Sequence, residues 1–96
     1  MPFAIQVSPQ AKEHLKALRK RDQQIIVDAI RLRLTDQPDQ PTRNRKKLED
    51  NPLAPWELRL GNFRVFYDVG EQEVVIVAVG QKTHNVLRIG GEEIQL

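Results

Sequence analysis

The sequence predicts an α+β fold in which an N-terminal strand and a helical hairpin pack on a mainly antiparallel four-stranded sheet. Three observations favour it. A short segment of period two opens the chain, two segments of helical period follow, and from Trp56 onward apolar residues recur at every second position. Consecutive strands joined by short turns pair as an antiparallel meander, so the second half of the chain supplies most of the sheet.

The length and composition indicate a single domain, residues 1–96, with a modest core. The absence of cysteine excludes disulfides and thiolate metal sites. The chain opens without the charged and apolar segments of a secretion signal, and its longest apolar run, residues 74–79, is far below the roughly 20 residues that span a bilayer. We therefore expect a cytoplasmic protein that contacts no membrane.

The first strand and the first helix meet at Ser8. Apolar residues alternate with polar or small ones over residues 3–7, which is the period of a half-buried strand. Serine is a preferred helix N-cap and proline suits the first helical position, so Ser8 and Pro9 predict that a helix begins there. The apolar face of this helix comprises Ala11, Leu15 and Leu18.

A second helix completes the predicted hairpin. The basic run at residues 19–21 suits the negative end of the first helix, and Asp22 can cap the second. The apolar stripe of the second helix comprises Ile26, Ala29, Ile30 and Leu34. Two prolines within residues 37–41 end it, and residues 42–55 then form a long polar connection of the kind that is often functional or disordered.

The predicted sheet begins at Trp56. Glycine at the first of two turn residues is typical of a type II′ hairpin, so Gly61 places Arg59 directly opposite Arg64. The apolar run of residues 74–79 predicts a central strand that is covered on both faces. Residues 84–89 fit either a short strand or a turn of helix, and the acidic end beyond them either closes the sheet or stays mobile.

The paired arginines are the sharpest candidate for a functional site. Like charges opposite one another are destabilising unless an anion lies over them. That anion is either Glu57, two residues away, or an external phosphate, and a solvated pair that leans apart is the third alternative. We expect the Arg64 side chain on the exposed face of the sheet.

A second basic cluster precedes the sheet. Four cations lie within five residues there: Arg43, Arg45, Lys46 and Lys47. Such a cluster either contacts the phosphates of a nucleic acid or belongs to a solvated loop. Residues 1–64 carry 13 of the 15 lysines and arginines and 8 of the 13 acids, so this part has a charge of +5 and the rest −3. The asymmetry is compatible with a polyanion on one side, although a mixed solvated surface gives similar counts.

The two histidines, His14 and His84, stand outside any metal-binding spacing, and the nucleotide-binding and serine-nucleophile motifs are absent. We therefore expect no metal and no cofactor. His14 lies beside an apolar stripe, which favours a structural role. His84 follows the central strand close to Lys82, and an imidazole can take up or release a proton near neutral pH.

Two stretches resemble the sheet signature of RelE/ParE toxins. They read PWELRLGNFRVFYDV at residues 55–69 and VAVGQK at residues 77–82. With the preceding strand and helical hairpin, the resemblance to this superfamily covers nearly the whole chain. It implies a RelE-like fold and the toxin of a type II toxin–antitoxin module, which a cognate antitoxin protein neutralises.

For the RelE branch, the resemblance implies metal-independent cleavage of messenger RNA on the ribosome. Arg64 matches the central catalytic arginine, Arg59 a basic residue of the preceding strand, and Lys82 the basic residue after Val-Gly. His84 is a candidate acid or base. Glu57 departs from the pattern, because the RelE branch carries lysine there, and Arg88 stands near the position of an expected C-terminal aromatic or histidine. A gyrase-binding toxin of the ParE type and an inactive RelE-fold binding protein therefore stay open.

Overall fold

The computed structural model describes residues 3–48, 53–90 and 92–94. Strand, helix, helix and then strands follow one another as the sequence predicts. The elements in chain order are β1 (Ala4–Val7), α1 (Pro9–Lys16), α2 (Lys20–Arg33), β2 (Arg45–Lys47), β3 (Trp56–Leu60), β4 (Phe63–Val69), β5 (Glu73–Thr83), β6 (Val86–Ile89) and β7 (Glu92–Ile94). No helix within the described ranges is long and apolar enough to cross a bilayer.

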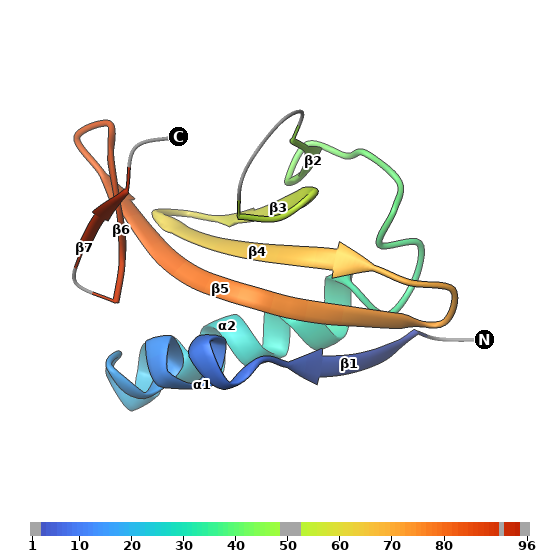
Figure 1. Cartoon of the computed structure of the whole chain (residues 1–96), viewed down its shortest axis with the longest axis horizontal. Coiled ribbons are helices and arrows are strands. Elements are labelled where there is room, and N and C mark those ends of the chain that lie inside the picture. Colours follow the sequence, from blue (N-terminus) through green and yellow to red (C-terminus); the bar gives the residue numbers. More distant parts are fainter. Residues whose placement is uncertain (1–2, 49–52, 91, 95–96) are drawn as a thin grey trace.

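One twisted sheet forms the centre of the molecule, and both helices cover one of its faces (Figure 1). Its order is β2-β3-β4-β5-β6-β7, with β1 paired parallel to β5 and the remaining pairs antiparallel. The sequence predicted a mainly antiparallel sheet correctly, but four strands was too few, since the described residues form seven. Two of the three added strands, β2 and β7, have three residues each, too few to reveal a period of two; the third is β6, where the sequence left strand and helix open.

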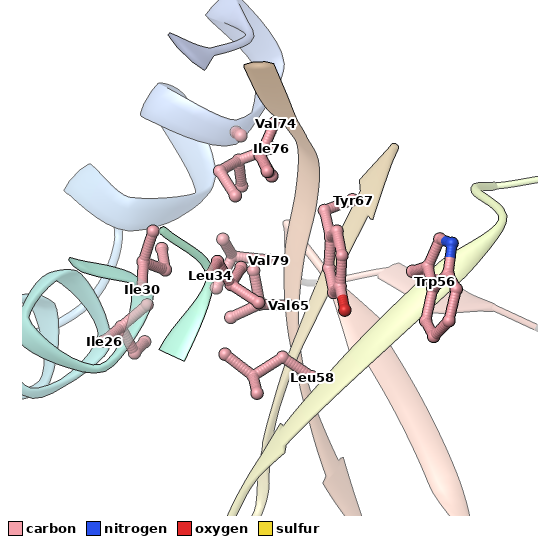
Figure 2. Close-up of a cluster of buried hydrophobic side chains, with 11 residues drawn as sticks. Ile26, Ile30, Leu34, Trp56, Leu58, Val65, Tyr67, Val74, Ile76 and Val79 are labelled. Atoms are coloured by element: carbon pink, nitrogen blue, oxygen red, sulfur yellow. The ribbon is translucent and has the colours of Figure 1, made fainter. Parts of the chain in front are cut away.

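The main core lies between the helices and the sheet. In Figure 2, Ile26, Ile30 and Leu34 reach from the helical layer toward the sheet residues Val65 and Val79. This confirms the predicted stripe of α2. At the edge of the core the rings of Trp56 and Tyr67 stack with centroids 6.0 Å apart, and the Tyr67 hydroxyl donates a hydrogen bond to the Pro38 carbonyl at 2.8 Å.

Helix α1 fills a gap in the outer edge of β5. That edge pairs with β1 at residues 73–76 and with β6 at residues 80–83. Between them, the Ser8 hydroxyl donates to the Val77 carbonyl at 3.0 Å and accepts from the Ala11 amide, as predicted for an N-cap. His14 Nδ1 accepts the Val79 amide at 3.2 Å. Backbone groups that no strand satisfies are thus paired by side chains of α1.

A smaller apolar cluster lies on the opposite face of the sheet. It comprises Ala54, Phe66, Ala78, Leu87 and Ile89. The β6–β7 hairpin stands at one end of β5 and contributes two of these residues (Figure 1). Because this cluster backs the other side of β5, the prediction of a central strand covered on both faces is confirmed.

Three local predictions were wrong. Arg19, and not Asp22, is the N-cap of α2, and Asp22 lies in its first turn, where a carboxylate still favours the positive helix end. The basic run at residues 19–21 therefore begins α2 and does not end α1. The connection at residues 42–55 contains strand β2, which pairs with β3.

Candidate anion-binding site

Four cations and Glu57 share the sheet face that the helices leave uncovered, and Asp68 lies on the same face farther along β4. Directly opposed residues point to the same side, and the register pairs Lys46 with Glu57 and Arg59 with Arg64. The predicted hairpin register is therefore confirmed, with Gly61 at a φ of 58° in the turn. Lys82 completes the set from β5. We call Lys46, Glu57, Arg59, Arg64 and Lys82 the cationic face; its net charge is +3.

A β-bulge brings Lys82 to this face. The pairing of β4 with β5 shifts between Phe66 and Tyr67, which face Ala78 and Ile76, so Val77 is an extra residue in β5. One added residue reverses the alternation of side chains beyond it. Without the bulge Lys82 would point toward the helices, on the same side as Ile76. With it, Lys82 and Arg64 lie on one side.

Glu57 holds the two arginines together. Its Oε2 lies 3.2 Å from Arg59 Nε and its Oε1 lies 3.7 Å from Arg64 Nε. The Glu57 side chain is only 9% exposed, whereas that of Arg59 is 43% exposed. Of the three alternatives for the paired arginines, the structure selects the internal carboxylate.

Arg64 is mostly buried, which corrects the expectation of an exposed side chain. It is 14% exposed, and its Nη1 donates to the carbonyls of Gly61 at 2.7 Å and Phe63 at 2.9 Å. Its Nε is buried and has no hydrogen-bond acceptor among the residues that the structure describes. The hairpin turn and Glu57 therefore fix this guanidinium within the sheet.

Lys46 and Lys82 present the most accessible charge of the cationic face. Both side chains are exposed, and neither belongs to an ion pair among the residues that the structure describes. Lys82 and Glu57 line a groove of about 470 Å³ between the sheet and the β6–β7 hairpin. Its other lining residues are Asn85, Val86, Leu87, Glu93 and Ile94.

The predicted basic cluster at residues 43–47 is divided. Lys46 joins the cationic face, whereas alternation along β2 directs Arg45 and Lys47 to the other side. Arg45 Nη1 donates to three carbonyls at the end of α2, those of Arg33, Asp36 and Gln37, at 2.8 to 3.1 Å. Arg43 lines a separate groove beside it. Only one of the four cations thus lies beside the arginine pair.

The two histidines occupy different settings. His84 is exposed in the two-residue turn between β5 and β6, with φ of 51°, and Asn85 beside it has φ of 66°. Two residues of positive φ are typical of a type I′ turn. His14 lies on the helix side, where burial lowers its pKa, and its bond to the Val79 amide agrees with the predicted structural role. Within the described ranges, no group of three or more His, Asp or Glu residues could hold a metal ion.

The sequence suggested Glu57 as a partner for the arginines but gave no sign of its burial. The groove was missed altogether, because its walls come from β3, β5 and the β6–β7 hairpin. The only signal for that hairpin was the weak apolar pattern of residues 84–89.

Comparison with known proteins identifies related sequences and folds. A family model described as the ParE toxin of the type II toxin–antitoxin system, parDE, matches residues 5–86. Among solved structures, a chain of the toxin–antitoxin complex RelBE2 from Mycobacterium tuberculosis superposes with a TM-score of 0.74. It is 23% identical, and the match covers 85% of this chain and 93% of that one, which establishes the likeness of the fold. No curated protein sequence gives a significant match.

Proposed function

This chain belongs to the ParE toxin family of type II toxin–antitoxin systems, and on that premise we propose that it is a ribosome-dependent endoribonuclease that cleaves messenger RNA and stops translation. The cationic face carries the proposal. Lys46, Arg59 and Lys82 reach one exposed surface from three different strands. Exposed lysine and arginine side chains of this kind bind phosphates without reading sequence.

The cleavage reaction needs charge stabilisation more than it needs a cofactor. The 2′-hydroxyl oxygen attacks the adjacent phosphorus, and the bond from phosphorus to the 5′ oxygen breaks. Negative charge grows on the phosphorane-like transition state, and fixed cations lower its energy. We assign Lys82 to phosphate contact, and Arg59 and Arg64, which both pair with Glu57, to positive charge beside the reacting phosphate. His84, exposed beside Lys82, is the candidate for moving a proton to or from the reacting oxygens.

The proposal includes a cognate antitoxin that covers the chain. The similar chain in the RelBE2 structure was solved in a toxin–antitoxin complex, which supports such a partner here. Helix α2 also exposes Ile25 and Leu32, at 46% and 78%, on its outer side. These two residues are seven positions apart, so they share one face of the helix. An amphipathic segment of an antitoxin would cover them.

A gyrase-binding toxin of the ParE type is the second candidate. The family description favours it. So does Glu57, because the guanidinium that would stabilise a transition state is already paired and largely buried. In this alternative the cationic face would contact protein and no RNA would be cleaved.

Induced expression with pulse labelling of protein and DNA synthesis tests the proposal. We expect the wild type to stop translation first, and the double variant Arg59→Ala/Lys82→Ala to lose this effect. The charge-matched control is Lys12→Ala/Lys20→Ala, on the exposed sides of the helices, which should remain toxic. Primer extension on ribosome-bound messenger RNA should reveal cleavage within codons. Early replication arrest without RNA cleavage would instead identify the gyrase-binding alternative.

A further inference from the structure

We propose that Glu57 is a built-in counter-anion that occupies Arg59 and Arg64 and lowers the affinity of the cationic face for external phosphate. It is thus a residue that sets substrate affinity, while Lys46 and Lys82 supply most of the contacts. The inference rests on the proposed function only where the external anion is RNA; for a small anion it stands alone.

The geometry places one carboxylate between two guanidinium groups. Glu57 presents one oxygen to each arginine Nε, at 3.2 and 3.7 Å. A bound phosphate would need these same donors, because arginine recognises phosphate through its Nε and Nη groups. The site that a phosphate would occupy between the arginines is therefore already filled by the protein's own anion.

Glu57 is also held in place by the backbone. Glu57 is the second residue of β3, paired with Lys46 of β2 on one side and with Phe66 of β4 on the other. Its side chain is 9% exposed, so swinging into solvent would leave Arg64 Nε, already without a hydrogen-bond acceptor, with no carboxylate beside it. An uncompensated buried charge is strongly unfavourable. An incoming phosphate therefore meets a fixed like charge.

The two lysines of the cationic face, unlike its two arginines, are not paired with Glu57. Lys46 and Lys82 are exposed and belong to no ion pair among the described residues. They flank Glu57, one across the strand pair and the other across the groove. A polyanion such as single-stranded RNA would thus bind the lysines at the rim, while the arginine pair contributes little in the wild type.

The first experiment compares Glu57→Gln with the wild type for binding of a short fluorescent single-stranded RNA. Glutamine keeps the shape and removes the charge. We expect binding about tenfold tighter, the order expected for one freed charge-assisted contact, and a salt dependence steeper by about 0.7 per phosphate gained. The control is Glu92→Gln, an exposed residue of β7 outside the groove, which should change affinity less than about twofold, the effect of one screened surface charge. Unchanged affinity in folded Glu57→Gln would overturn the inference.

The same preparations separate this inference from the proposed function. Thermal unfolding with added inorganic pyrophosphate should show a larger rise in midpoint for Glu57→Gln than for the wild type. If neither protein binds RNA but the variant responds to pyrophosphate, the role of Glu57 stands and RNA is the wrong ligand. If Glu57→Gln binds RNA as the wild type does but cleaves it much more slowly, the carboxylate acts in proton transfer and the inference fails.

A test in the wild-type background covers the case in which Glu57→Gln does not fold. Lys82→Ala should reduce the salt dependence of RNA binding by about 0.7, the loss of one phosphate contact on a single strand. Arg59→Ala should reduce it by much less, because Glu57 already pairs with that arginine. Equal reductions by the two variants would show that Arg59 contacts phosphate freely, and would refute the inference.

Discussion

The bond between His14 and β5 makes the stability of this protein depend on pH. His14 Nδ1 accepts the Val79 amide at 3.2 Å, in the stretch of the β5 edge between the segments paired with β1 and β6. Only the neutral imidazole has an acceptor nitrogen, so protonation would turn this contact into two donors facing one another. Burial lowers the pKa of His14 below its ordinary value of 6.5.

The direction of this pH dependence follows from the difference between the pKa of His14 in the folded chain and in the unfolded chain. Since the pKa is lower in the folded state, the unfolded chain takes up the proton first as pH falls. The stabilisation is complete above pH 6.5 and is lost below it, as the pH approaches the folded-state pKa. One proton limits the slope to about 1.4 kcal/mol per pH unit. For the hydrogen bond itself, which is only partly buried, we expect about 1 kcal/mol.

Two variants separate the contribution of the His14–Val79 hydrogen bond to stability from the effect of protonating His14. His14→Asn keeps a carbonyl acceptor but has no proton to gain, so its free energy of unfolding should stay constant relative to the wild type above pH 7 and become relatively higher near pH 5. His14→Ala removes the acceptor, and should cost about 1 kcal/mol at pH 7.5, or about 4–8 °C in the unfolding midpoint. Urea unfolding between pH 5 and 8 measures both. A constant difference between wild type and His14→Asn over this range would refute the reasoning.

Three further predictions concern the fold. Tyr67→Phe should lower the free energy of unfolding by about 1 kcal/mol, because the buried Pro38 carbonyl loses its donor; a urea titration with no loss would contradict this. Arg45→Ala should lower the free energy of unfolding by about 1 kcal/mol through its lost bonds to the end of α2, whereas Lys47→Ala beside it should change that free energy by less than about 0.5 kcal/mol. Gly80→Ala should loosen the β6–β7 hairpin, since a Cβ there would lie 2.7 Å from a β6 carbonyl; hydrogen exchange in β6 should then accelerate, and unchanged protection would argue against a steric role.

The sequence predicted those features that local chemistry determines. Ser8 and Pro9 define the start of α1 because capping involves neighbouring residues only. Gly61 defines the β3–β4 turn in the same way, and with it the pairing of Arg59 and Arg64. From a short turn and its flanking strands, the central part of the candidate site was therefore predictable.

Features that depend on contacts between distant segments were not predictable. The apolar run at residues 74–79 hides the bulge at Val77, because every residue in it is hydrophobic and either alternation fits. The side to which Lys82 points was therefore undetermined. Likewise, the burial of Arg64 depends on a carboxylate and a turn that close around it in the folded sheet. The sequence around a charged residue in a strand does not show which distant groups will surround its side chain in the folded protein.

The division of the cationic face into buried and exposed charges determines which substitutions can separate function from folding. Glu57 and Arg64 lie within the sheet. Removing Glu57 leaves the guanidinium of Arg64 uncompensated, and removing Arg64 leaves Glu57 with Arg59 alone, so either change affects stability together with binding. Lys46 and Lys82 are exposed and belong to no ion pair among the described residues, so their removal leaves both the core and Glu57 unchanged. A loss of toxicity in Arg64→Ala could thus come from lost stability or from lost binding, whereas a loss in Lys82→Ala would come from lost binding alone. Because the family resemblance points first to Arg64 and the structure makes it the least separable member of the face, the two lysines are the better probes of what this toxin binds.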